Sequence, residues 1–316
     1  MINIEPTVNK SSYCVLSCII RYLQYLEAPY KAMLLCNWSM GSIRGNKITL
    51  PYSISPLQTL KIATGTRINI IHKPDATSEI IQNEINKGKP VIAYVDSYNC
   101  DWMTYFHKIH ADHYILFIGF EKNTYYALDP YLNNSINRIP SSVVETGLLL
   151  DNMGNHMIEK ENEKIFIFDK IGYMKHSIDE IVKYIIEKYS CIYSQNIKML
   201  YNYFSEIDTI SFLLNMNDIV HNKFYFDLKS IVDSREDFFI GLKYVNSELN
   251  SRLIDLDDIR EFEPIVQLWK KFLSCLYRFS YTTEIKKRKE IIMRAQEYLG
   301  NLQLKEYTFA DKILEK

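Results

Sequence analysis

The sequence predicts an α+β domain over residues 1–170, followed by an all-α domain over residues 171–316. Short runs rich in Ile, Val, Tyr and Phe lie between residues 66 and 170, and turn residues separate them, as is typical of β-strands. An amphipathic helix precedes these runs, because apolar residues recur at helical spacing over residues 14–26. After residue 170 the patterns become helical.

The elements of the first domain follow in a simple order. Strands are predicted over residues 67–72, 90–96, 113–120, 124–129 and 164–168. A second helix is predicted over residues 78–87, because Gly88 and Pro90 follow it. Residues 121–123 have the composition of a tight hairpin turn. We therefore expect a helix first and then a mainly antiparallel sheet.

The second domain is predicted to contain four to six helices. Ser177 and Glu180 form a capping-box pattern ahead of an apolar helical run. Further helical patterns cover residues 194–214, 237–249, 265–279 and 284–299.

Composition excludes several classes of protein. Lys plus Arg number 37 against 38 Asp plus Glu, a net charge of −1, whereas a general nucleic-acid binder carries a basic excess. No signal-peptide pattern is visible, and no apolar run approaches the ~18–20 residues of a membrane span. We therefore expect a cytoplasmic protein that binds neither nucleic acid nor membrane.

The thiol and imidazole groups do not indicate a metal site. The six cysteines form no CxxC pair and no zinc-type spacing with histidine, so we expect reduced thiols. His107, His110 and His113 stand three residues apart, which is a ligand spacing on a helix, but His113 is predicted to begin a strand. We predict no metal.

Cys14 is the candidate nucleophile. It opens the first predicted helix, two residues after Ser12 and its neighbour Ser11, which suit an N-cap. Free N–H groups and the positive end of the helix dipole favour a thiolate there and can supply half of an oxyanion hole. A small apolar residue in a buried helix is the alternative.

His113 and Asp129 complete a candidate triad with Cys14. His113 begins one predicted strand and Asp129 ends the next, so the two residues can meet across the hairpin. In Cys–His catalysis the histidine takes the thiol proton and later returns it, while the acid fixes its tautomer. The alternative is a strand-capping histidine and an Asp-Pro turn.

The segments SYCVLSCIIRYL, HYILFIGF and YYALDPY resemble two related groups of papain-like domains. One is the bacteriocin-exporter leader peptidases. The closer is the butirosin-biosynthesis acyltransferase type, in which such a cysteine domain precedes a mainly helical region. The resemblance covers residues 8–170. It implies a papain-like fold with Cys14, His113 and Asp129 as the catalytic triad.

Three further residues are candidates for oxyanion or substrate binding. The leader peptidases carry a Gln shortly before the nucleophile, whereas Asn9 is the nearest amide ahead of Cys14 in this sequence. Trp38 and the segment 41–45 are predicted to form a mobile loop over the cleft. Arg44 in that loop could bind a phosphate or a carboxylate, and a solvated arginine is the alternative.

The resemblance implies an acyltransferase of natural-product, antibiotic-type biosynthesis. Cys14 would take an acyl or peptidyl chain from the phosphopantetheine thioester of a carrier protein, and a small amine would release it as an amide. Thioester exchange is nearly isoenergetic, so it tolerates an incomplete oxyanion hole. A papain-like cysteine peptidase or hydrolase and a non-catalytic module that binds carrier protein or peptide stay open. We expect no bound cofactor, and the sequence indicates no oligomeric state.

Overall fold

The chain forms two compact units in a computed structural model, whose described residues are 1–8, 14–28, 30–38, 42–44, 47–49, 61, 65–151, 163–170, 178–204 and 223–316. The first unit comprises Met1–Tyr30 and Ser55–Lys175, and the second comprises Lys31–Ile54 and His176–Lys316. An N-terminal helix and a six-stranded antiparallel sheet are followed by a helical region, so the predicted fold class is confirmed. The units differ from the predicted division in that residues 31–54 group with the helical region.

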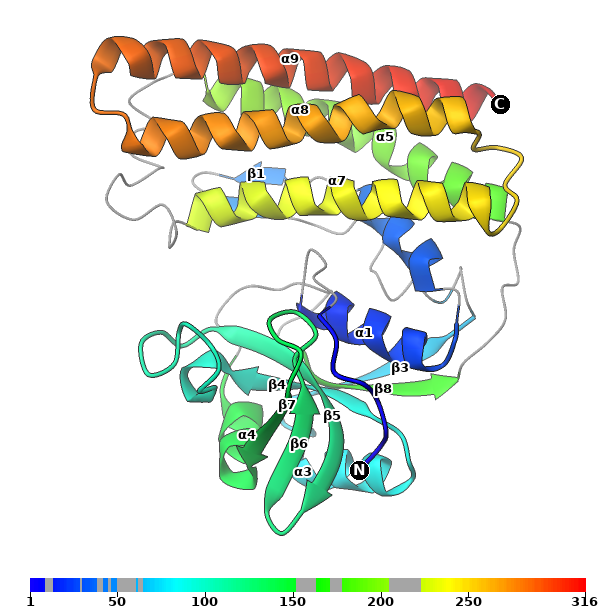
Figure 1. The fold of residues 1–316 in the computed structure, drawn as a ribbon, viewed down its shortest axis with the longest axis vertical. Coiled ribbons are helices and arrows are strands. Elements are labelled where there is room, and N and C mark those ends of the chain that lie inside the picture. Colours follow the sequence, from blue (N-terminus) through cyan, green and yellow to red (C-terminus); the bar gives the residue numbers. More distant parts are fainter. Residues whose placement is uncertain are drawn as a thin grey trace. The chain divides into compact units, whose positions relative to one another are not determined.

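The sheet of the first unit has the strand order β3-β8-β4-β5-β6-β7, and neighbouring strands are antiparallel (Figure 1). Its strands are β3 (Arg67–His72), β4 (Val91–Asp96), β5 (Asp112–Glu121), β6 (Thr124–Leu128), β7 (Ile136–Pro140) and β8 (Glu163–Lys170). All five predicted strands are present, and the sequence analysis missed β7. β4 and β5 lie at the centre of the sheet and carry almost entirely buried side chains.

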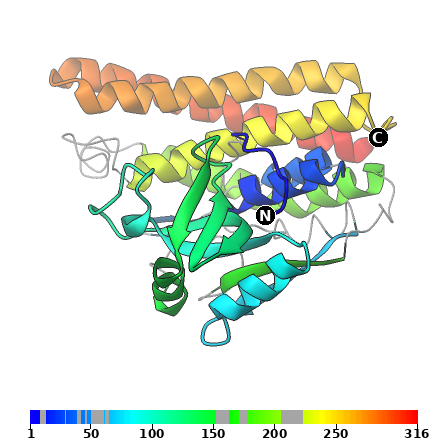
Figure 2. The same ribbon diagram turned by 60° about the horizontal axis from the view of Figure 1, so that its bottom comes forward.

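Helices cover both sides of this sheet. Helix α1 (Cys14–Tyr25) packs against β4 and β5. Helices α3 (Ser78–Asn86) and α4 (Ser141–Leu149) lie on the opposite side in Figure 1, come forward in Figure 2, and share one apolar core with the strands. The apolar stripe of α1 thus fixes Cys14, its first residue, on the sheet.

The predicted hairpin between β5 and β6 is confirmed. Glu121 pairs with Thr124, and the two residues between them, Lys122 and Asn123, have φ angles of 47° and 64°. Two consecutive positive φ angles are typical of a type I′ turn, whose twist matches that of the strands. The hairpin brings the end of β6 alongside the beginning of β5.

Among the described residues, the second unit contains four long helices and a short hairpin. The helices are α5 (Ile178–Tyr203), α7 (Lys223–Ser247), α8 (Leu256–Tyr281) and α9 (Ile285–Glu315), and the hairpin strands are β1 (Ser42–Arg44) and β2 (Lys47–Thr49). The helices are longer than predicted: α8 begins before Pro264, and α5 runs without the predicted break through residue 203. Ser177 and residues 205–214 of the predicted helix 194–214 lie outside the described residues.

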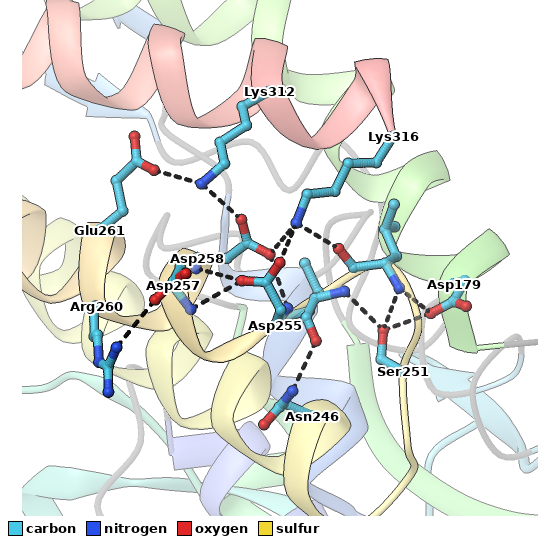
Figure 3. A network of polar contacts seen from close by, with 12 residues as sticks. Asp179, Asn246, Ser251, Asp255, Asp257, Asp258, Arg260, Glu261, Lys312 and Lys316 are labelled. Carbon is cyan, nitrogen blue, oxygen red and sulfur yellow. Dashed lines mark hydrogen bonds and ion pairs between the residues drawn. The ribbon is translucent and has the colours of Figure 1, made fainter.

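A network of charged groups joins the beginning of α8 to the end of α9 (Figure 3). Asp255 caps α8 by accepting hydrogen bonds from the N–H groups of Asp257 and Asp258, each at 2.9 Å. Asp258 accepts one from the N–H of Asp255 at 2.8 Å, which completes a capping box. Lys316 donates to both Asp255 and Asp258, at 2.8 and 2.6 Å.

Trp38 belongs to the core of the helical unit. It ends the 3₁₀ helix η1 (Tyr30–Trp38) and is fully buried. Its ring centroid lies 4.6 Å from that of Phe238, 5.4 Å from that of Phe262 and 5.7 Å from that of Phe309. The prediction of a mobile loop residue over the cleft was therefore wrong, because aromatic residues of α7, α8 and α9 enclose Trp38.

Trp38→Ala should lower the free energy of unfolding by about 3–5 kcal/mol, because it opens a cavity among three phenylalanines. Denaturant unfolding followed by circular dichroism measures the change. Leu304→Ala is the control, since Leu304 of α9 is 66% exposed and should cost less than about 0.5 kcal/mol. An equal effect of the two variants would contradict the core position of Trp38.

Candidate active site

Cys14 is the first residue of α1, and its side chain is almost fully buried. The residues that follow it, Val15 and Leu16, are buried as well and hold this end of the helix in the core. The thiol lies beside the imidazole of His113, close enough to help raise the pKa of that imidazole. Asn9, the candidate oxyanion donor, lies outside the described residues. The candidate nucleophile and the candidate base are therefore neighbours.

His113 and Asp129 form a buried pair. His113 is the second residue of β5 and Asp129 directly follows β6, and their exposed fractions are 4% and 0%. His113 Nε2 donates to Asp129 Oδ2 at 2.7 Å, because a carboxylate only accepts. The nitrogen left for Cys14 is Nδ1. The structure thus joins the three residues in the order that the sequence predicted.

Two further donors hold the Asp129 carboxylate. Trp102 Nε1 donates to Oδ2 at 2.8 Å, and the backbone N–H of Leu132 donates to Oδ1 at 3.2 Å. Burial raises the pKa of Asp129, but the charge of His113 and these hydrogen bonds outweigh it and lower the pKa below its ordinary value. Trp102 was not predicted as a site residue. The sequence signal that could have indicated it is the presence of a tryptophan in the polar turn segment between two core strands.

Comparison with protein families gives a match for the first unit. Residues 3–146 match the model of the Peptidase_C39 like family. The N-terminal domain is Peptidase_C39-like. The match covers Cys14, His113 and Asp129 and a little under half of the chain. No curated protein matches this chain.

The imidazole of His113 in the C39-like domain has a raised pKa. Burial lowers the pKa of His113, but the charge of Asp129 and its hydrogen bond, with smaller contributions from Cys14, raise it to about 10. His113 therefore carries a proton at neutral pH in the resting domain, next to the thiol. A protonated imidazole beside a thiol is the arrangement that supports nucleophilic cysteine chemistry.

Two other thiols of the C39-like domain belong to its core. Cys18 lies one helical turn after Cys14, is fully buried and donates to the carbonyl of Tyr114 at 3.5 Å. Cys100 is also fully buried and donates to the carbonyl of Asp96 at 3.5 Å. Burial is the main cause that raises the pKa of both thiols. Both thiols therefore stay protonated at neutral pH.

The surroundings of His107 and His110 differ from those of His113. His107 is exposed and stacks on Phe106, with ring centroids 3.9 Å apart. His110 Nδ1 lies 2.5 Å from a carboxylate oxygen of Asp96. Over the described parts of the chain, no three His, Cys, Asp or Glu residues are grouped so that they could hold a metal ion.

The remaining candidate residues lie in the helical unit. Trp38 is part of its core, as described above, and Arg44 ends strand β1. Of the six predicted site residues, the structure thus brings together Cys14, His113 and Asp129. None of the described helices has the length and apolar character needed to cross a membrane.

Trp102→Phe should lower kcat/KM about tenfold. The change removes the indole N–H donor of Asp129, and a hydrogen bond to a charged group contributes about 1.5 kcal/mol or more. Steady-state kinetics measures the effect. Met103→Leu, a volume-conserving change at the next residue, is the control and should leave kcat/KM within about twofold. Equal kcat/KM values for the two variants would show that the hydrogen bond from Trp102 does not contribute to activity.

Proposed function

We propose that the C39-like domain is a cysteine-dependent acyltransferase. It moves an acyl or peptidyl chain from a carrier-protein thioester through an acyl-Cys14 intermediate to an amine, in natural-product biosynthesis of the antibiotic type. The observation that carries the proposal is the buried contact of Cys14 with His113, whose other nitrogen is fixed by Asp129. This contact provides a nucleophile and a base of high proton affinity in one place.

The first half of the reaction acylates Cys14. The Cys14–His113 pair reacts with its proton on His113 Nδ1, and the sulfur attacks the thioester carbonyl. The tetrahedral intermediate then expels the phosphopantetheine thiolate, which takes the proton from His113. Donor and product of this step are both thioesters, so little driving force is needed and a complete oxyanion hole is not essential.

The second half transfers the acyl group to the amine. The uncharged amine attacks the carbonyl of acyl-Cys14, and His113 accepts a proton from the attacking nitrogen. The C–S bond then breaks, the amide leaves, and the proton on His113 restores the resting state of the pair. The ion pair with Asp129 that raises the pKa of His113 makes this imidazole a strong base for that proton.

The architecture after the C39-like domain also supports the proposal. The butirosin-type acyltransferases have a mainly helical region after their cysteine domain, and here α5, α7, α8 and α9 lie beyond residue 146, where the family match ends. A cysteine hydrolase is the second candidate, because the matching family is described as peptidase-like. The two candidates differ in what releases acyl-Cys14.

The fate of the acyl group decides between these candidates. The full chain is incubated with an acyl thioester on a carrier protein, and the bound acyl group is followed by intact-protein mass spectrometry. An acyltransferase holds the adduct in water and loses it with formation of an amide when an amine is added. Release by water at the same rate with and without amine supports the hydrolase, and a chain that never gains an adduct contradicts both enzymes.

We propose that the carrier protein docks beside the N-terminal turn of α9. A carrier protein is expected to present an acidic helix next to its phosphopantetheine. Tyr281 and Ile285 are 60% and 68% exposed there, and Lys286 and Lys289 are exposed beside them. Arg288 has a local role instead, because its Nε donates to the carbonyl of Thr282 at 2.5 Å. Cations at the rim of an apolar contact mainly raise the association rate.

Lys286→Glu combined with Lys289→Glu should lower kcat/KM about tenfold for a carrier-bound donor, because like charges would then meet in the docked complex. The rate with a small-molecule thioester should stay unchanged. Lys305→Glu, an exposed cation further along α9, is the control. Equal effects on the two donors would show that these lysines solvate the helix and do not dock the carrier.

A further inference from the structure

A second histidine–carboxylate pair lies in the C39-like domain. His110 Nδ1 donates to Asp96 Oδ2 at 2.5 Å, and the other oxygen of Asp96 accepts the N–H of Tyr98 at 3.0 Å. The Asp96 side chain is 1% exposed, whereas that of His110 is 50% exposed. Because Nδ1 carries the proton of this hydrogen bond, Nε2 of the neutral ring is an acceptor. A buried acid thus fixes the tautomer of a half-exposed imidazole.

The strand register places Asp96 one position from the residue that pairs with His113. Asp96 is the last residue of β4 and pairs with Asp112, and Val95 pairs with His113. The N–H of Ser97 donates to the carbonyl of Ala111 at 3.0 Å, which closes the loop between the two strands. His110 precedes His113 by three residues, so their Cα atoms are at most about 11 Å apart. A small acceptor molecule can span that distance.

We propose that His110, oriented by Asp96, is the base that deprotonates the acceptor ammonium before it attacks acyl-Cys14. This inference rests on the proposed acyltransferase function and assigns the acceptor to the class of primary amines that are cationic at neutral pH. In that role His110 is a catalytic residue of the second half-reaction, and Asp96 is a positioning residue.

The proton balance requires such a base. An alkylamine is an ammonium ion at neutral pH, and forming an amide removes two of its protons. One proton passes to His113 and restores the resting, protonated imidazole as the C–S bond breaks. The other must leave before attack, because an ammonium ion has no free electron pair. His110 Nε2 takes this proton and, being half-exposed, passes it to water.

The charges around the pair favour a cationic acceptor. Burial raises the pKa of Cys100, and the negative charges of Asp129, Asp96 and Asp101 raise it further. Lys164 of β8 is also attracted to Asp96, so the local field is not solely negative. The aromatic ring of Tyr98 stacks on His110 with centroids 4.2 Å apart and supports the imidazole.

The acceptor's own charge provides the test. Acyl-Cys14 is prepared with a small-molecule thioester and mixed with either propylamine, which is an ammonium ion at neutral pH, or hydroxylamine, which is uncharged. Loss of the adduct is followed by intact-protein mass spectrometry. His110→Gln should slow transfer to propylamine about 100-fold, in the range of general base catalysis, and change transfer to hydroxylamine less than threefold. Asp96→Asn should show the same selectivity with a smaller loss.

His107→Asn is the matched control. His107 lies in the same loop with a φ angle of 52°, a conformation that asparagine tolerates, and its ring centroid is 5.2 Å from that of Tyr98. The rates at which the His107→Asn variant transfers the acyl group to the two amines should match those of the wild type. Equal slowing of the two amines by His110→Gln, or slowing of neither, overturns the role of His110. A wild type that forms acyl-Cys14 but releases it only to water overturns the proposed function and this inference with it.

Discussion

Replacing Cys14 with alanine should abolish amide formation, with kcat falling by a factor of about 10⁴ or more. The thiol is the group that His113 contacts, and without it no covalent intermediate can form. Cys14→Ser should be nearly as inactive, because a hydroxyl group holds its proton far more tightly than a thiol. Both variants should fold, since each preserves a small residue at the first position of α1.

The control for this prediction is Cys275→Ala. Cys275 is a buried residue of α8, and its pKa is raised by burial. This variant should keep the wild-type kcat. Amide formation from a small-molecule thioester is measured for all three variants. Retention of more than about a hundredth of the activity by Cys14→Ala would assign the nucleophile to another group.

Asp129→Asn should lower kcat/KM by a factor of about 10³–10⁴, as in other triads whose acid is replaced by an amide. The carboxylate fixes Nε2 of His113 as the donor, and its charge, opposing the effect of burial, is the main cause of the raised pKa. Without that charge the imidazolium loses its proton more readily. The alkaline limb of the kcat/KM profile should therefore move from about pH 10 to a lower pH.

The same pair should contribute to stability within a defined pH window. The folded pKa of His113 is raised, so its contribution is complete below the unfolded value of about 6.5 and is lost as the pH rises through about 10. The pKa of Asp129 is lowered, so its contribution is present above about pH 3.9 and is lost on acidification. The free energy of unfolding of the wild type should thus exceed that of Asp129→Asn most between about pH 4 and 6.5, by about 3 kcal/mol.

Denaturant unfolding at several pH values tests the window, with Asp151→Asn as the control. Asp151 is 79% exposed and pairs with Lys73 at the surface, so its loss should matter little at any pH. A stability difference for Asp129→Asn that stays constant from pH 5 to pH 10, together with an unchanged alkaline limb, would contradict the ion pair.

Local patterns were enough to predict the elements that hold the triad. The strands that carry His113 and Asp129 are short apolar runs with a turn between them, and α1 shows a plain helical stripe. Because Cys14, His113 and Asp129 sit at the ends of these elements, predicting the elements also predicted that the three residues lie close together.

The errors concern residues whose surroundings come from distant parts of the chain. Trp38 was expected in a loop, but its neighbours lie on α7 and α8, which begin at residues 223 and 256. Trp102 and the pair of His110 with Asp96 depend on how the loop between β4 and β5 folds back on the sheet. Such contacts leave no periodic pattern in the sequence, so the sequence could not indicate them.

The position of the acyl group on the chain shows whether Cys14 is the nucleophile. The protein is incubated with a thioester donor in the absence of amine, digested, and examined by tandem mass spectrometry. All six cysteines are compared. We expect a single acyl group on the sulfur of Cys14, and none when His113 is replaced by alanine. An acyl group on any other residue, or an equal yield on Cys14 without His113, would contradict it.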